Sequence, residues 1–156
     1  MGPSPLSSPS CVATVTIACF DSSAFVKLLV DEPGSELAEQ LWNEADAVAA
    51  SRLALPEVSA ALSAARRAAR LDETTERKAR REWSAYWAAI DVVELTAAVA
   101  ADAADLAGRL LLGGADAVHL ASALSLFAAD PILVSWDRRL SAAALDTGLP
   151  VVPSGF

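Results

Sequence analysis

The sequence predicts an α/β fold of three layers, a parallel β-sheet with helices on both faces. The first observation is that short apolar runs alternate with longer amphipathic segments, an order typical of βαβ units. The second is that 54% of the residues are hydrophobic, many of them alanine, which suits a helix-rich protein with a full core. The third is a length of 156 residues, which is sufficient for one domain of this class.

Five short apolar runs are expected to form the strands. Residues 13–20 contain β-branched side chains and Phe20 but no charged residue, which favours a buried strand. The other strands are expected at 47–51, 91–95, 131–135 and 149–153. Parallel strands need crossover connections, so the intervening segments are expected to be helices that cover the sheet.

Apolar residues recur at helical spacing in the segments between these strands. The expected helices span 22–30, 35–43, 54–70, about 72–90, 97–111, 115–127 and 137–145. Thr96 precedes one of them as an N-cap residue. Gly113 and Gly114 are expected to end that same helix, since glycine readily adopts the left-handed conformation found there.

Residues 1–12 are expected to be a disordered leader, and residues 13–156 the folded domain. The leader is rich in Pro and Ser and has no apolar periodicity. No Lys or Arg precedes Lys27, so the start lacks the basic region of a signal peptide. No apolar run reaches the roughly 18 residues that a membrane span needs. We therefore expect a cytoplasmic protein that does not enter a membrane.

The charge is acidic overall but unevenly distributed. A net charge of −8 argues against binding nucleic acid through a general basic surface. Seven of the twelve cations nevertheless lie between Arg66 and Arg81, interleaved with four acids from Asp72 to Glu82. This segment is either a solvated helix face or a local basic arm, and the sequence leaves both interpretations open.

Four carboxylates occur where a parallel sheet could bring them together, at the carboxyl ends of its strands. Asp21 directly follows the first expected strand, and Asp137 follows the fourth. Glu57 and Asp116 lie in the first turns of their helices. Each could also serve only to cap a helix or to stabilise its first turn. Four such groups together would repel one another unless a cation lay between them.

Oxygen ligands with no Cys or His expected nearby suit Mg²⁺ or Mn²⁺, ions that support phosphoryl chemistry. We expect Asp21 and Asp116 to be direct ligands, with Glu57 and Asp137 completing the shell directly or through water. Ser23 is expected as an accessory residue that hydrogen-bonds Asp21 or a free helix N–H group. His119, the single histidine, is expected to be a hydrogen-bonded packing residue rather than a catalytic base.

Four segments of the sequence resemble the PIN-domain family, and most of all the VapC-type toxins of bacterial toxin–antitoxin modules. The segments are FDSSAFVKLLV, LPEVSAAL, GADAVHLASAL and LVSWDRRLSAAA followed by GLPVV. They occur in the order and approximate spacing of the family, and the resemblance covers nearly all of residues 16–152. The family pattern places its acids on Asp21, Glu57, Asp116 and Asp137. The family often has Thr before the last acid, and here Ser135 offers a hydroxyl two residues ahead.

The resemblance implies a five-stranded parallel sheet in the order 3-2-1-4-5. It also implies metal-dependent cleavage of RNA, a cognate VapB-type antitoxin as partner, and a homodimer. An arginine of the antitoxin could reach the carboxylates, while Trp83 and Trp87 could anchor an antitoxin helix.

Other classes of protein remain as alternatives. One is a PIN-fold RNA-processing nuclease outside a toxin module, and another is a fold of this type that only binds. A phosphatase of the haloacid-dehalogenase type also has an Asp after its first strand, but it needs a second Asp where this chain has Ser23. A receiver domain needs a phosphorylatable Asp at the end of a central strand, and Glu94 and Leu95 fit that need poorly.

Overall fold

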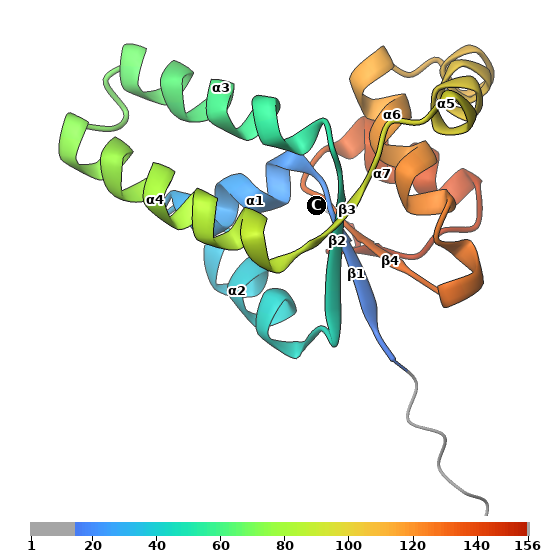
Figure 1. Cartoon of the computed structure of the whole chain (residues 1–156), viewed down its shortest axis with the longest axis horizontal. Helices are drawn as coiled ribbons and strands as arrows, with labels where there is room; N and C mark the ends of the chain where they lie inside the picture. Colours follow the sequence, from blue (N-terminus) through green and yellow to red (C-terminus); the bar gives the residue numbers. More distant parts are fainter. Residues whose placement is uncertain (1–14, 156) are drawn as a thin grey trace, which may run out of the picture.

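Five parallel strands form one sheet in the computed structural model, which describes residues 15–155 (Figure 1). The strands are β1 (Ile17–Phe20), β2 (Ala47–Ser51), β3 (Asp91–Val93), β4 (Ile132–Val134) and β5 (Val151–Val152). Their order is β3-β2-β1-β4-β5, which confirms the predicted topology. The first strand of the chain is therefore the central strand of the sheet, with β2 on one side and β4 on the other.

Helices cover both faces of the sheet, so the fold has the three layers that were expected. One face carries α1 (Ser22–Leu29), α2 (Ser35–Glu44), α3 (Ala54–Arg67) and α4 (Glu73–Ala89). The other carries α5 (Ala97–Leu110), α6 (Gly114–Leu124) and α7 (Arg138–Asp146), with a short 3₁₀ helix at Phe127–Ala129. None of the helices formed by residues 15–155 is long and apolar enough to cross a membrane.

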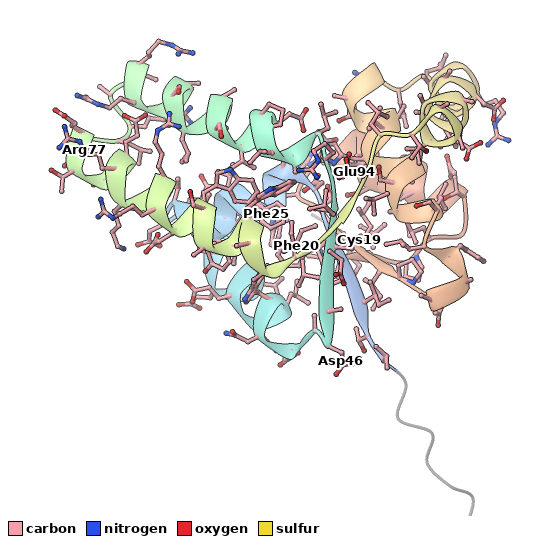
Figure 2. All side chains as sticks on the ribbon, in the orientation of Figure 1. Cys19, Phe20, Phe25, Asp46, Arg77 and Glu94 are labelled. Atoms are coloured by element: carbon pink, nitrogen blue, oxygen red, sulfur yellow. The ribbon has the colours of Figure 1, made fainter. Side chains whose placement is uncertain are left out.

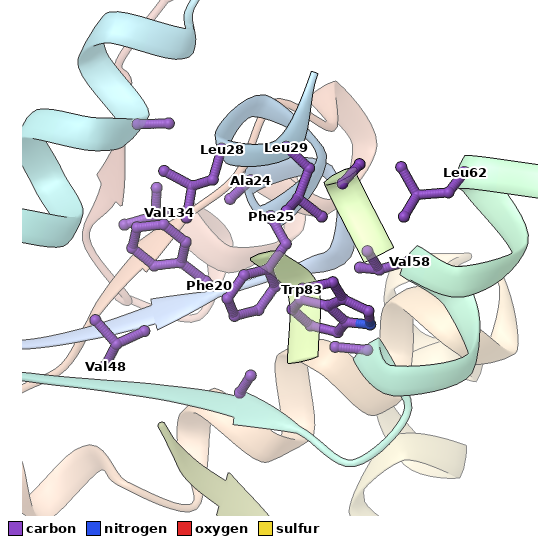
Figure 3. Packing of buried hydrophobic residues seen from close by; sticks show 14 of the residues in the cluster. Phe20, Ala24, Phe25, Leu28, Leu29, Val48, Val58, Leu62, Trp83 and Val134 are labelled. Carbon is purple, nitrogen blue, oxygen red and sulfur yellow. The ribbon is translucent and has the colours of Figure 1, made fainter. Parts of the chain in front are cut away.

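The hydrophobic core has two halves, one on each face of the sheet. Alternation along β1 sends Phe20 to the α1–α4 side and Cys19 to the α5–α7 side. On the first side Phe25 lies between Phe20 and Trp83, at ring-centroid distances of 5.4 and 4.8 Å (Figure 3). Trp83 is only 4% exposed, so the expectation that it anchors a partner is wrong, because its indole is part of the core.

Some predicted boundaries differ from those of the structure. Gly113 and Gly114 do not end α5: Leu111 is its C-cap, at a φ of 53°, and Gly113 is the N-cap position of α6. The expected helix at 115–127 ends at Leu124. The described part of the first strand begins at Ile17, whereas residues 13 and 14 and the expected leader at 1–12 lie outside the described residues.

The helices α3 and α4 form a hairpin that extends away from the sheet (Figure 1). Arg77 lies near its tip (Figure 2). Asp72 caps α4 by accepting a hydrogen bond of 2.7 Å from the backbone N–H of Thr75. The hairpin contains the seven clustered cations, so the predicted arm exists as a structural element.

Many of the cations in the hairpin are paired with its own acids. Arg77 pairs with Glu73, Lys78 with Glu82 at 3.2 Å, and both Arg66 and Arg80 with Glu76 at 3.7 and 2.8 Å. The remaining three form no ion pair with any residue between 15 and 155; they are Arg67, Arg70 and Arg81. The hairpin is therefore partly neutralised by itself, and its free positive charge comes from these three exposed side chains.

Candidate metal centre

Asp21 stands at the carboxyl end of the central strand, directly after Phe20. Its backbone N–H donates to the carbonyl of Val134 at 3.2 Å, which joins it to the end of β4. Its carboxylate also caps α1, accepting a hydrogen bond of 2.9 Å from the N–H of Ala24. Asp21 therefore does act as the cap that the sequence suggested, but capping uses only one of its two oxygens.

Asp21 is only 4% exposed, and this burial has the largest effect on its pKa. The loss of hydration raises its pKa, although donors from Ser135 and Ser23 and the nearby charge of His119 act in the opposite direction. The Ser135 hydroxyl donates to Oδ2 at 2.6 Å and the Ser23 hydroxyl donates to Oδ1 at 2.7 Å. Both serines expected as accessory residues thus contact Asp21 directly.

Ser23 and Ser135 also connect Asp21 to the segment that follows β4. The N–H of Trp136 donates to the Ser23 hydroxyl at 2.9 Å, and the N–H of Asp137 donates to the Ser135 hydroxyl at 3.0 Å. Each serine hydroxyl therefore donates to the Asp21 carboxylate and accepts from a backbone N–H at position 136 or 137. This arrangement fixes Asp137 relative to Asp21.

Asp137 and Asp116 approach the site from the two helices α7 and α6. Asp137 is the N-cap of α7, and its Oδ1 accepts a hydrogen bond of 2.9 Å from the N–H of Leu140. Asp116 lies in the first turn of α6 and is half-buried. Burial raises the pKa of Asp116, and the negative charge of Asp137 raises it further, with smaller effects of Asp21 and Glu57. The four predicted acids are therefore close enough to influence one another.

Glu57, in the first turn of α3, is held differently from the other three acids. Its Oε2 accepts a hydrogen bond of 2.5 Å from the Ser22 hydroxyl and lies 2.5 Å from Nε2 of His119. Burial raises the pKa of Glu57, but the hydrogen bonds from His119 and Ser22 outweigh that effect and lower it. Glu57 therefore stays ionised more readily than an ordinary glutamate does.

His119 is buried, at 6% exposure, and it lies one turn after Asp116 on α6. Burial lowers its pKa, but the hydrogen bond to Glu57 and the charges of Asp21 and Asp116 raise it more, so its pKa lies above the ordinary value. The structure agrees with the expected hydrogen-bonded packing residue. No sequence pattern indicated that Glu57 and Ser22 are its partners, because they lie 62 and 97 positions away from His119.

The chemistry of these side chains fits a hard divalent cation. Burial raises the pKa of Asp21, and burial together with the neighbouring acids raises the pKa of Asp116, so a bound cation would reduce the cost of ionising both. As they stand, no three Asp, Glu, His or Cys side chains within residues 15–155 converge closely enough to enclose an ion.

Lys27, two turns into α1, is directed away from the acids. Its Nζ pairs with Glu32 at 2.9 Å and lies 5.9 Å from the centre of the Trp136 ring. Trp136 itself packs against Gly34, where an added Cβ would be 2.8 Å from the indole nitrogen. The sequence showed neither contact; a glycine at position 34 next to Pro33 indicated only a turn.

Comparison with known proteins agrees with this architecture. The model of the PIN domain family matches residues 18–145. A curated relative named Ribonuclease VapC45, from Mycobacterium tuberculosis (strain CDC 1551 / Oshkosh), is 51% identical over 135 residues, which cover 86% of this chain and 94% of that protein.

Two solved structures share the fold at low sequence identity. The crystal structure of PAE2754 from Pyrobaculum aerophilum superposes with a TM-score of 0.64 at 20% identity, covering 88% of this chain and 85% of the other. A toxin–antitoxin complex from Klebsiella pneumoniae gives a TM-score of 0.53 at 19% identity, covering 77% of this chain and 86% of the other.

The chain belongs to the PIN-domain family. Within that family it is a VapC-type protein, as its identity with the ribonuclease VapC45 over nearly the whole of both chains indicates.

Proposed function

We propose that this protein is the toxin of a toxin–antitoxin module and that it acts as a divalent-metal-dependent endoribonuclease. The observation that carries the proposal is the buried Asp21 carboxylate, which ends the central strand among three other acids. Helix capping explains one oxygen of Asp21 but not the neighbouring acids. The 51% identity with a protein named as a ribonuclease supports the same activity here.

The proposed ligands are Asp21 and Asp116, with Glu57 and Asp137 completing the shell directly or through water. A Mg²⁺ or Mn²⁺ ion bound there would supply an acidified water and neutralise charge on a phosphodiester. Asp21 is oriented by the two serine hydroxyls, and Asp137 keeps one oxygen free because only Oδ1 accepts the cap hydrogen bond. These contacts support the proposal that Asp21 and Asp137 would offer oriented oxygens to a cation.

The proposed partners are an RNA substrate, a VapB-type antitoxin and a second copy of this chain. The fold is shared with a chain of a toxin–antitoxin complex. An antitoxin arginine reaching the acids would satisfy their charge as a cation does. Trp87, which is half-buried beneath the guanidinium of Arg52 at 5.5 Å, remains available as an apolar contact, unlike Trp83. Cleavage of RNA would take place in the cytoplasm.

The test is cleavage of single-stranded and structured RNA by the purified protein with Mg²⁺, Mn²⁺ or excess chelator. We expect cutting with one or both ions and none with chelator, and we expect matched DNA to remain intact. RNA cleavage that persists in chelator would contradict the metal-dependent mechanism. Cleavage of phosphomonoesters but not of RNA would instead favour the phosphatase alternative.

The toxin role needs a separate test. Expression of the chain alone should arrest bacterial growth, and co-expression of the short open reading frame next to its gene should restore it. Purification of the pair should then give a complex without ribonuclease activity. An active nuclease that neither arrests growth nor binds that product would be an RNA-processing enzyme outside a toxin module.

A further inference from the structure

His119, on α6, contacts Glu57, and the proposed metal-dependent cleavage assigns no role to this contact. His119 is almost fully buried, and its Nε2 lies 2.5 Å from Oε2 of Glu57. The Ser22 hydroxyl donates to the same oxygen at 2.5 Å. No residue between 15 and 155 donates to Oε1, the other oxygen of Glu57. One oxygen is therefore held by two donors, while the other is left for a ligand.

We infer that His119 is a positioning residue, which together with Ser22 fixes Glu57 so that its second oxygen can serve a divalent cation. The inference rests on the proposed metal-dependent function. A carboxylate on a three-torsion side chain has many orientations, and donors that hold one oxygen reduce them before the cation arrives. The role needs only a donor at Nε2 and a carboxylate at position 57.

The place of His119 in the fold supports this role. Glu57 begins α3 and Asp116 begins α6, and these helices cover opposite faces of the sheet (Figure 1). His119 is three residues after Asp116, so both side chains lie on the same side of α6. Its hydrogen bond to Glu57 therefore connects the two helices at the edge where the acids meet.

A general-base role fits the same contacts less well. The Nε2 atom is already engaged with Glu57 and lies 3.3 Å from the Ser22 hydroxyl. The side chain is 5% exposed, which leaves little room for a substrate or an attacking water at the ring. The geometry therefore assigns His119 to the support of Glu57.

The test is Mn²⁺ binding to the full chain, measured by titration calorimetry and by the spectroscopic signal of free Mn²⁺. His119→Leu removes the donor but fills the space, and His119→Gln keeps an N–H near the position of Nε2. We expect His119→Leu to weaken Mn²⁺ binding by about 10- to 100-fold, the usual cost of losing a partner that orients a ligand. His119→Gln should remain close to the wild type.

A double substitution separates positioning from a general structural effect. In a Glu57→Ala background, His119→Leu should weaken Mn²⁺ binding no further, because the group that it positions is gone. Ser22→Ala, which leaves the buried ring in place, should also weaken binding and is informative even if His119→Leu fails to fold. Thermal melting of each variant identifies those that are folded.

Each outcome is decisive. Equal or tighter Mn²⁺ binding by His119→Leu and Ser22→Ala overturns the inference and leaves the proposed metal centre intact. A further loss in the Glu57→Ala background, or a His119→Gln variant as weak as His119→Leu, shows that His119 acts through packing and also overturns it. Absence of Mn²⁺ binding by the wild-type chain contradicts the proposed function itself, and the inference fails with it.

Discussion

The Ser135 hydroxyl donates a hydrogen bond of 2.6 Å to Oδ2 of Asp21, although 114 positions separate the two residues. The contact joins the ends of the neighbouring strands β1 and β4 and is fully buried. A hydrogen bond to an ionised group in such a place contributes about 1.5–3 kcal/mol to stability. It is thus one of the stronger single interactions at this edge of the sheet.

Ser135→Ala should therefore destabilise the protein by about 1–3 kcal/mol at neutral pH, measured by urea unfolding. Ser141→Ala is the matched control. Ser141 is also buried, but its hydroxyl has no hydrogen-bond partner in the described part of the chain. Its removal should be neutral or slightly stabilising. Equal losses for the two variants would show that the Ser135 contact contributes no specific stability.

Asp21→Asn and Asp116→Asn should abolish RNA cleavage while leaving the fold intact. Each removes a proposed ligand charge. Asp116→Asn also removes repulsion among the acids, so this variant without metal should melt at the same or a higher temperature. Asp21→Asn loses the charged acceptor of the Ser135 and Ser23 hydroxyls, so it should not gain stability. Asp102→Asn, an exposed change on α5, should leave both properties unchanged. Full activity of Asp116→Asn at ordinary Mg²⁺ concentration would remove Asp116 from the proposed ligands.

The stability of the metal-free protein should fall as the pH rises from mildly acidic to alkaline values. Asp21 and Asp116 have pKa values above the ordinary 3.8, so the folded chain binds these protons more tightly than the unfolded chain does. That stabilisation is lost as the pH rises from 3.8 through the raised values. His119, whose pKa is raised from 6.5, also stabilises the fold less as the pH rises above 6.5. Glu57, with its pKa lowered from 4.5, acts in the opposite direction and favours folding at higher pH.

Chemical unfolding in chelator across this pH range measures the effect. In Asp116→Asn one of the raised carboxyl groups is absent, so the decline should be shallower than in the wild type. A stability that increases steadily from pH 5 to pH 8 would contradict the raised pKa values of Asp21, Asp116 and His119, because Glu57, with its pKa lowered from 4.5, is already ionised in both states across that range.

Gly34→Ala should cost more stability than Gly148→Ala. Both glycines have a positive φ, 100° and 84°, so both substitutions impose backbone strain of about 1 kcal/mol. Only at Gly34 would the new Cβ also meet a side chain, 2.8 Å from the indole nitrogen of Trp136. Trp136→Leu should recover part of the loss at Gly34. Indistinguishable unfolding free energies for the two alanine variants would show that the Trp136 side chain moves aside without a loss of stability.

Charge reversal on the hairpin should weaken RNA cleavage only where the cations are free. Glu at the three unpaired positions, Arg67, Arg70 and Arg81, should reduce the rate and flatten the dependence of binding on salt by roughly 0.7 per lost phosphate contact. Arg109→Glu, on α5 across the sheet, provides the control. If the triple variant cuts RNA with an unchanged salt slope, the hairpin is only a solvated surface.

Strand order, helix number and the helical first turns of Glu57 and Asp116 could be expected from periodicity and family resemblance. Helix ends were less certain because they depend on local backbone geometry. Leu111 adopts a left-handed conformation although two glycines follow it, which leaves Gly113 free to begin α6. A residue with a side chain at a positive φ is uncommon, so the glycines were the natural prediction.

The candidate site was predictable in its members but not in its contacts. The positions of Asp21 and Asp137 follow from the rule that sites form at the carboxyl ends of parallel strands. The orientation of Glu57 toward His119 depends on how α3 and α6 pack across the sheet, which no local pattern encodes. The pairing of Lys27 with Glu32 likewise could not be predicted from a local pattern.

The central position of β1 has a consequence for a chain still being made on the ribosome. Asp21 emerges 114 residues before Ser135, yet β4, Ser135 and Asp137 are the parts that lie directly beside it. An unfinished chain, even one long enough to contain Asp21, Glu57 and Asp116, has an open sheet edge where its fourth acid belongs. Synthesis itself thus delays completion of the acidic site until the chain through Asp137 has been made.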